Sequence, residues 1–292
     1  MHLKKAIKGK IRQLLGIENL AMEQALQADS IKSVCQLEQK RLFFYYQNLV
    51  REKKYLPLIN DVGFRVYSQT DEDGILLYIF SLIGMINKKC VDIAFASPFG
   101  ANTTNLIRNW NWRGLLICGR NYEAEASNVF FAKNPNTFLA KPKIVNEWIT
   151  AENVNEVLVQ SGFSGEVDLF SLDIDGVDYW IWKNLEVIAP RVVVLEFQKD
   201  LGLKPLTVPY KPDFDRFDID ENFYGASLPA FVKLADKKGY RLVALNNLKF
   251  NAFFIKNGIA EDIIPTKSVE ECLQGCEYNK SGLASKFDWI EV

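Results

Sequence analysis

Apolar and amphipathic segments alternate along the chain from residue 66 onward. Near-continuous apolar runs predict strands over 90–96, 115–119, 143–149, 167–175 and 191–198. Segments of helical periodicity are predicted over 102–110, 122–133, 150–160 (with Thr150 as N-cap) and 179–188. Strands buried on both faces that alternate with helices indicate an α/β fold, in which helices cover both faces of a parallel sheet.

The end of this region predicts a change of strand direction. A helix begins at Ser227, ends at Gly239, and leads into predicted strands over 240–246 and 250–256. The short link from Asn247 to Lys249 cannot cross over to a parallel neighbour, so the two strands must form an antiparallel hairpin. Five parallel strands followed by a hairpin are the pattern of class I methyltransferases, whereas dinucleotide-binding Rossmann domains end with another parallel strand.

The segments before the sheet are predicted to be helical. Residues 1–16 form a basic amphipathic pattern, and residues 30–54 form a second helix with Ser30 as N-cap and four aromatic residues at 43–46, of which part should be buried. Thr70 to Asp73 resemble a capping box for a helix that Gly84 ends. The sequence thus divides into a helical arm over 1–60, a Rossmann-like domain over 61–258 and a C-terminal tail over 259–292, with one helix around 268–274.

Charge and histidine content narrow the chemistry. Lys plus Arg is 35 and Asp plus Glu is 36, which gives a net charge of −1, so we expect no nucleic-acid partner. The single histidine, His2, lies at the N-terminus, which removes Ser-His-Asp and Cys-His catalysis and most histidine-based metal sites. Proton transfer must therefore fall to carboxylates, Tyr, Lys, Cys or a bound metal.

Cysteine use and targeting signals point to the cytoplasm. The five cysteines contain no CxxC pair and are expected to be reduced thiols. No apolar run reaches the roughly 18 residues of a membrane span, and the basic N-terminus lacks the apolar stretch of a signal peptide. Residues 1–16 suit two roles: peripheral contact with the inner membrane face, or packing on the body or on a second subunit of a homo-oligomer.

The richest candidate chemistry follows the strand predicted over 167–175. Asp173, Asp175 and Asp178 cluster at this strand end, and Glu196 ends the adjacent strand. Crowded carboxylates raise each other's pKa or attract a cation, so the cluster offers a base or a metal site without histidine. Asp173 and Asp175 also fit the DxD pattern by which many glycosyltransferases hold a metal and a sugar nucleotide. The alternative is that Asp178 caps the next helix and the others are solvated.

Three further segments complete the predicted site. The turn after the strand over 90–96 is poor in glycine and contains neither GxGxxG nor a Walker motif, which argues against a cradle for a dinucleotide or a triphosphate. An acid that grips ribose hydroxyls normally ends the second strand, but Cys118, Gly119 and Arg120 stand there, with Glu123 nearby. Residues 205–220, rich in Pro and Asp, are predicted to form a loop over the site.

Several motifs, in order, resemble one family. The segment SQTDEDG at 68–74 resembles the SQxxEDG lead-in of FkbM-like, S-adenosylmethionine-dependent methyltransferases. The segment LDIDGVDYW at 172–180 resembles their IDIDGxDYW signature, and the segments 190–196, 225–228 and 251–254 also match. The resemblance covers residues 66–257. It implies a class I methyltransferase fold, S-adenosylmethionine as cofactor, and methyl transfer, often to sugar hydroxyls of polysaccharide or natural-product precursors.

The resemblance also implies the roles of individual residues. The candidate cofactor-binding residues are Gln69, Asp92, Ala94, Ser97, Gly100, Asn102, Thr103, Cys118 and Arg120. The candidate catalytic residues are Asp173, Asp175, Asp178 and Glu196, with Asp173 and Asp175 as candidate metal ligands.

The chain departs from the family in the cofactor half. Where the family carries a loop such as AAGDG, this chain has AFASPF at 94–99, and Cys118 replaces an acid. Loss of a ribose-binding carboxylate costs about 1.5–3 kcal/mol.

Three hypotheses follow. The leading one is a methyltransferase that acts on a hydroxyl of a sugar or surface-glycan precursor, a small-molecule or glycan substrate. The second is a catalytically silent binding or scaffold protein, whose adenosine pocket Phe95, Pro98 or Phe99 would fill. The third is a metal-dependent enzyme that processes sugar nucleotides with Asp173 and Asp175.

Overall fold

The computed structural model describes residues 17–276 and 282–292, and side chains from residue 34 onward. The predicted helix over 1–16 lies outside the described residues. The chain divides into two compact units, residues 1–54 and 55–292. Within the described ranges, no helix combines the length and the apolar character that crossing a bilayer requires.

The first unit contains a long helix, α2 (Ile17–Arg51). The helix starts well before Ser30, so the predicted N-cap at Ser30 is wrong. The preceding residues are mostly Glu, Ala, Leu and Gln, strong helix formers that continue the helix through this serine. Phe43 and Tyr46 are buried whereas Phe44 and Tyr45 are more than half exposed, which confirms that part of the aromatic run is buried.

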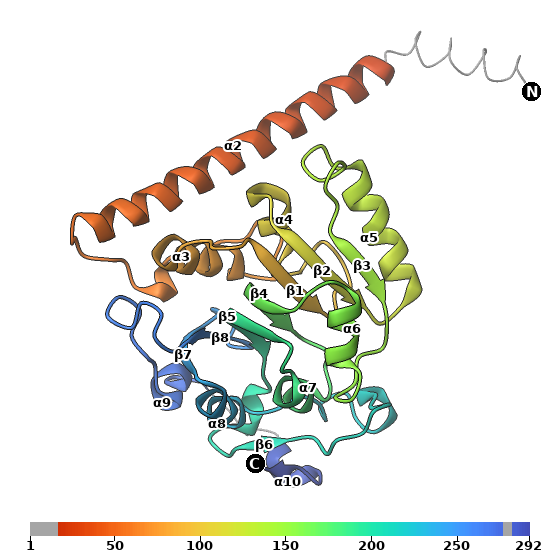
Figure 1. Cartoon of the computed structure of the whole chain (residues 1–292), viewed down its shortest axis with the longest axis vertical. Helices are drawn as coiled ribbons and strands as arrows, with labels where there is room; N and C mark the ends of the chain where they lie inside the picture. The colour runs from red at the N-terminus through yellow and green to blue at the C-terminus, as the bar shows by residue number, and fades with distance from the viewer. Residues whose placement is uncertain (1–16, 277–281) are drawn as a thin grey trace, which may run out of the picture. The chain divides into compact units, whose positions relative to one another are not determined.

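The second unit contains a seven-stranded sheet with the order β3-β2-β1-β4-β5-β8-β7 (Figure 1). The strands are β1 (Lys89–Ile93), β2 (Arg113–Cys118), β3 (Lys143–Asn146), β4 (Gly165–Leu172), β5 (Ile188–Glu196), β7 (Tyr240–Leu245) and β8 (Asn251–Lys256). The first five pair in parallel, and β8 is antiparallel to both β5 and β7. The predicted class I methyltransferase-type sheet with its terminal hairpin is confirmed.

Several strands end earlier than their apolar runs predict. Strand β1 ends at Ile93 rather than at residue 96, and β4 ends at Leu172 rather than at residue 175. In both cases a non-glycine residue with positive φ lies just beyond the strand: Ala94 at 70° and Asp175 at 54°. Since extended strands need negative φ, Ala94 turns the chain out of the ladder directly after β1, whereas Asp175 bends the loop that follows the end of β4.

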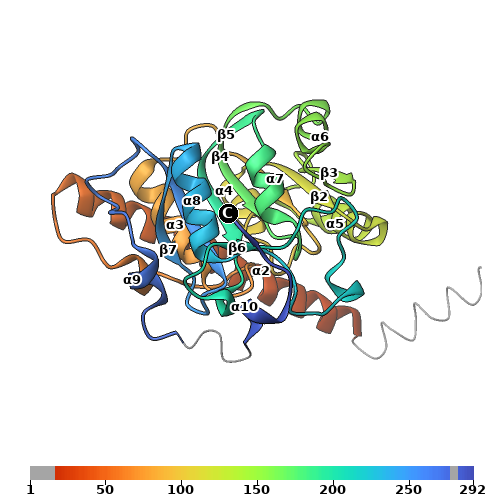
Figure 2. The same ribbon diagram turned by 90° about the horizontal axis from the view of Figure 1, so that it is seen from below.

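Alternate residues of each strand face two separate cores, which confirms helices on both faces of the sheet. Val91 and Leu115 belong to one core with the helices α6 (Val154–Gln160), α7 (Asp178–Asn184) and α8 (Leu228–Lys238). Cys90 and Leu116 belong to the other core with α3 (Glu72–Ile83), α4 (Thr104–Trp110) and α5 (Asn121–Lys133). Figure 2 shows α7 and α8 over one face of the sheet.

The helix boundaries follow local capping chemistry. As predicted, Ser227 caps α8 by accepting a hydrogen bond from the Ala230 N–H, and Gly239 ends the helix in a left-handed conformation. Helix α6 begins after Asn153, later than predicted from Thr150 as N-cap. The Thr150 hydroxyl accepts a hydrogen bond from the Asn153 N–H at 3.3 Å, and the Asn153 side chain accepts one from the Thr150 N–H at 2.8 Å, so this reciprocal pair fixes a turn ahead of the helix.

The predicted capping box at the start of α3 is also wrong, because the acids bind other partners. Asp73 accepts hydrogen bonds from the N–H groups of residues 66, 67 and 68 at 2.6–2.9 Å. The fully buried Glu72 accepts hydrogen bonds from the amides of Asn246 and Asn251 at 3.0 Å each. The segment over 68–74 therefore ties the start of α3 to the β7–β8 hairpin.

Smaller elements complete the second unit. They are the 3-10 helices η1 (Ile59–Asp61), η2 (Lys199–Leu201) and η3 (Arg216–Asp218), the antiparallel strands β6 (Leu206–Thr207) and β9 (Ile290–Glu291), and the helices α9 (Val269–Leu273) and α10 (Leu283–Lys286). Helix α9 lies within the predicted range and begins with a capping box between Ser268 and Glu271. Residues from this C-terminal segment, among them Leu273, Phe287 and Trp289, pack on the core that contains α8.

Candidate active site

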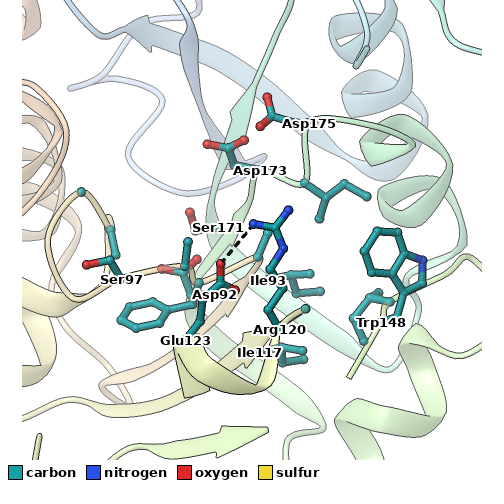
Figure 3. Close-up of a pocket in the computed structure, with 18 of the residues that line it drawn as sticks. Asp92, Ile93, Ser97, Ile117, Arg120, Glu123, Trp148, Ser171, Asp173 and Asp175 are labelled. Carbon is teal, nitrogen blue, oxygen red and sulfur yellow. Dashed lines mark ion pairs between the residues drawn. The ribbon is translucent and has the colours of Figure 1, made fainter. Parts of the chain in front are cut away.

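A cavity of about 470 Å³ opens at the carboxyl ends of β3, β2, β1 and β4. Its size lies in the range of small-molecule sites, and its position is where open α/β sheets bind ligands. Figure 3 shows Asp173 and Asp175 toward one end of this cavity and Ile117 and Glu123 toward the other.

The cavity is open, and the side chains expected to block it lie elsewhere. Phe95 borders the cavity, but it is 1% exposed and packs in the core beside Phe131. Pro98 does not line the cavity, and Phe99 is 65% exposed at its rim. This arrangement argues against the blocked pocket expected of a silent binding protein.

Asp92 of β1 lies on the cavity wall, as predicted for a cofactor-binding residue. It is 6% exposed, and burial raises its pKa to about 7, although a hydrogen bond from the Thr103 side chain opposes the shift. The Thr103 hydroxyl donates that bond at 2.6 Å. Thr103 itself does not line the cavity, so its role is to orient Asp92.

The turn after β1 supplies most of the other predicted cofactor contacts. Ala94, Ser97, Gly100 and Asn102 all line the cavity, and so does Gln69. Gln69 is placed there because its neighbours pair with this turn: the Gly100 N–H donates a 2.6 Å hydrogen bond to the carbonyl of residue 67. The anchored segment over 68–74 therefore positions one wall of the site.

Asn102 carries a buried acceptor that a ligand would satisfy. Its Nδ2 donates to the Ser171 hydroxyl at 3.1 Å, whereas its Oδ1 is buried without a hydrogen-bond partner among the described residues. Buried polar atoms rarely stay unpaired in native proteins. Asn102 lines the cavity, so this oxygen suits a bound donor such as an ammonium group.

The end of β2 differs from the prediction. Cys118 does not line the cavity; its side chain is buried in the core with Leu116 and Phe131, and burial raises the pKa of the thiol to about 12. The residues on either side of Cys118 face the cavity, because side chains alternate along a strand. The side chain of Cys118, which was predicted to contact the cofactor, therefore does not face this cavity.

Arg120 lines the cavity as predicted, and it has an acidic neighbour there. Glu123, in the first turn of α5, also lines the cavity. The two side chains form an ion pair at 3.9 Å, marked by the dashed line in Figure 3. The sequence pointed to Glu123 only as an acid near the strand end.

Two further walls come from loops. Glu147, Trp148 and Ile149 follow β3 and line the cavity, which sequence reasoning missed because it extended this strand to residue 149. The predicted loop over the site is confirmed: Phe214, Arg216 and other residues of 212–217 line the cavity. The indole N–H of Trp148 donates to the carbonyl of residue 212 at 2.9 Å, which joins the two loops.

The end of β4 brings the predicted carboxylates together. Asp173 and Asp175 line the cavity, and one oxygen of each lies within 4.8 Å of a Glu196 oxygen. Glu196 does not line the cavity but is hydrogen-bonded to Asp173. The pKa of Glu196 is raised mainly by burial and, to a smaller extent, by repulsion from Asp173. Burial also raises the pKa of Asp173, but by much less. The pair therefore shares a proton that resides on Glu196.

Asp178 stands apart from this cluster. Its carboxylate is 2% exposed and accepts hydrogen bonds from the N–H groups of Ile174 at 2.8 Å and Gly176 at 2.9 Å. It does not line the cavity, so the structure gives it no access to a substrate. The predicted catalytic role of Asp178 is replaced by a positioning role, because these bonds hold the loop that carries Asp173 and Asp175.

The charges of the cluster are compensated by groups of the protein itself. The Arg216 guanidinium contacts an Asp175 oxygen at 2.6 Å, and it lies over the rings of Phe217 and Tyr224. Asp173 shares its proton with Glu196. A metal at Asp173 and Asp175 would compete with Arg216 for the charge of Asp175, and the metal site stays a prediction.

Neither a protein-family model nor a curated protein matches the sequence. Solved structures that resemble the chain include magnesium protoporphyrin IX methyltransferase (ChlM) from Synechocystis PCC 6803 with bound SAM, at 12% identity and a TM-score of 0.40, covering 63% of this chain and 76% of that chain. Another is an O-methyltransferase from Bacillus cereus in complex with SAH, at 12% identity and a TM-score of 0.40, covering 67% of this chain and 83% of that chain. At such values, the fold assignment rests on this chain's own strand order.

Proposed function

We propose that this protein is an S-adenosylmethionine-dependent methyltransferase that acts on a hydroxyl of a sugar or glycan precursor. The observation that carries the proposal is the open cavity at the carboxyl ends of a class I-type sheet. One part of the cavity offers acceptors for a cation, and another part holds a carboxylate placed to take a proton.

The residues on the β1 side fit the cofactor. Asp92 and the unpaired oxygen of Asn102 suit the ammonium group of S-adenosylmethionine, and the side chains of Ile117 and Trp148 offer apolar surface to an adenine ring. When bound, the cofactor would supply an electrophilic methyl group on a sulfonium. The protein's part is then to hold this group in line with the acceptor oxygen.

The residues on the β4 side fit the acceptor. With the cofactor bound, Asp173 would accept the proton of the acceptor hydroxyl, and the cofactor would supply the methyl group to that oxygen. Protonated Glu196 donates a hydrogen bond to Asp173 and orients it. Asp175, fixed by Arg216, is available as a second hydrogen-bond acceptor for the substrate.

Exposed aromatic side chains at the cavity support a carbohydrate acceptor. Phe99 and Phe217 both line the cavity and are 65% and 66% exposed. Aromatic rings offer broad, rigid apolar contact area, which suits the apolar faces of sugar rings.

The cytoplasmic location, and membrane or subunit contacts through residues 1–16, stay predictions.

A transfer assay tests the proposal. Purified protein is incubated with S-adenosylmethionine labelled in the methyl group and a panel of sugars, nucleotide sugars and oligosaccharides. We expect label transfer to a hydroxyl, and a rate that falls about 100-fold or more in Asp173→Asn. The control is Asp213→Asn, because Asp213 is an exposed acid of the same loop that does not itself line the cavity.

Two results would contradict the proposal. Transfer that is equally fast in Asp173→Asn would remove the proposed base. The absence of label transfer to every member of the panel would remove the carbohydrate acceptor.

A further inference from the structure

The cavity contains a carboxylate that no role described above uses. Glu123 lines the cavity close to the end of β2, where ribose-binding acids normally lie. The residue expected to carry that acid is Cys118, which is buried in the core. The acid that follows β2 in this cavity therefore lies on the next helix instead of on the strand.

The surroundings of Glu123 leave it ready to bind a ligand. Its side chain is 13% exposed, and its Oε1 accepts a hydrogen bond from the Tyr122 hydroxyl at 3.2 Å. Within the described part of the chain, its Oε2 has no hydrogen-bond partner. The ion pair with Arg120 is long, at 3.9 Å, and Arg120 is 63% exposed, so this cation can swing outward without losing buried contacts.

Helix geometry explains why Glu123 reaches the cavity. The N-cap residue Arg120 has an extended backbone, and α5 begins at Asn121. Glu123 thus lies in the first helical turn, next to the cavity, whereas Glu125 is exposed and bonds to the Asn121 amide at 2.7 Å. A position in the first turn suits an acid because of the helix dipole, and a carboxylate has two oxygens that can accept hydrogen bonds from two hydroxyls.

We infer that Glu123 binds the ribose hydroxyls of the adenosine cofactor, in place of the acid that the end of β2 lacks. This inference rests on the proposed function, because it assumes that an adenosine occupies the cavity. It assigns a specificity role to a residue outside the strand: Glu123 would distinguish a ribose from a sugar without hydroxyls.

The test measures how strongly the protein prefers adenosine to 2′,3′-dideoxyadenosine, in competition with S-adenosylhomocysteine, for the wild type and two variants. A hydrogen bond to a charged acceptor corresponds to a preference of about tenfold or more, which we expect in the wild type. In Glu123→Gln the preference should fall to about twofold, while the affinity for the dideoxy compound stays the same. In the control Glu125→Gln the preference should be unchanged. Thermal unfolding checks that both variants are folded.

The outcomes separate the two proposals. A Glu123→Gln variant that keeps the wild-type preference overturns the role of Glu123 and leaves the methyltransferase proposal intact. Equal loss of affinity for both nucleosides in Glu123→Gln also overturns it, because the effect would not depend on the hydroxyls. Absence of any binding of adenosine and S-adenosylhomocysteine to the folded wild type overturns both proposals.

Discussion

The proposed cofactor binding should depend on pH, and replacing Asp92 by asparagine should remove that dependence. Asp92 is buried at the cavity, and burial raises its pKa to about 7. If the ionised carboxylate binds the ammonium group of the cofactor, the protein must lose this proton before or during binding. Binding should therefore weaken as the pH falls below 7.

The magnitude follows from that pKa. At pH 6, a carboxyl group with a pKa of about 7 has about ten protonated molecules for each ionised one, so binding is about 11-fold weaker than to the fully ionised form. At pH 8 it is about 1.1-fold weaker. The dissociation constant of S-adenosylhomocysteine should thus rise about tenfold from pH 8 to pH 6. Neutral Asp92→Asn should show a flat profile at weak affinity.

Calorimetric titration over this pH range measures the effect. Repeating the titrations in buffers of different ionisation enthalpy counts the protons released. 5′-Methylthioadenosine is the matched ligand, because it carries the same nucleoside without the ammonium group, and its affinity should not change with pH. A tenfold change that persists in Asp92→Asn, or an equal change for both ligands, would refute the assignment of Asp92 as the cation-binding group.

Three further changes test other parts of the structure. Asp178→Ala leaves two backbone N–H groups without their acceptor, and we expect a loss of about 2–3 kcal/mol in the free energy of unfolding, measured by urea denaturation; an unchanged midpoint would show that the loop does not need this carboxylate. In Glu72→Gln the new amide group is a donor that faces the donors of Thr70 and Asn246, and we expect the free energy of unfolding in the same assay to fall by about 1–3 kcal/mol. Removal of divalent cations with EDTA should leave methyl transfer unchanged, because Arg216 already compensates Asp175; a rate restored by added manganese would contradict this.

The topology of the sheet could be predicted from the sequence because it depends on local features. The short link from Asn247 to Lys249 forces a hairpin, and alternation of apolar strands with helices forces parallel pairing of the rest. Strand ends were harder to predict. Ala94 turns the chain away directly after β1 with a positive φ, and alanine gives no sign of such a turn in the sequence.

The candidate site was predicted only where its residues follow strands directly. Asp92, Asp173 and Asp175 line the cavity as expected. Trp148 lines it because a loop 64 residues further along the chain holds its indole, and such a tertiary contact leaves no pattern in the sequence. For the same reason Glu72 looked like part of a capping box, although its partner Asn246 is 174 residues away.

The central claim is that the cavity at the carboxyl ends of the sheet binds S-adenosylmethionine. The most direct test is a calorimetric titration of the wild-type protein with S-adenosylmethionine and with S-adenosylhomocysteine. The proposed function predicts saturable binding of both at a single site, accompanied by a rise in the unfolding temperature. No heat and no shift in the unfolding temperature at millimolar ligand would contradict the account.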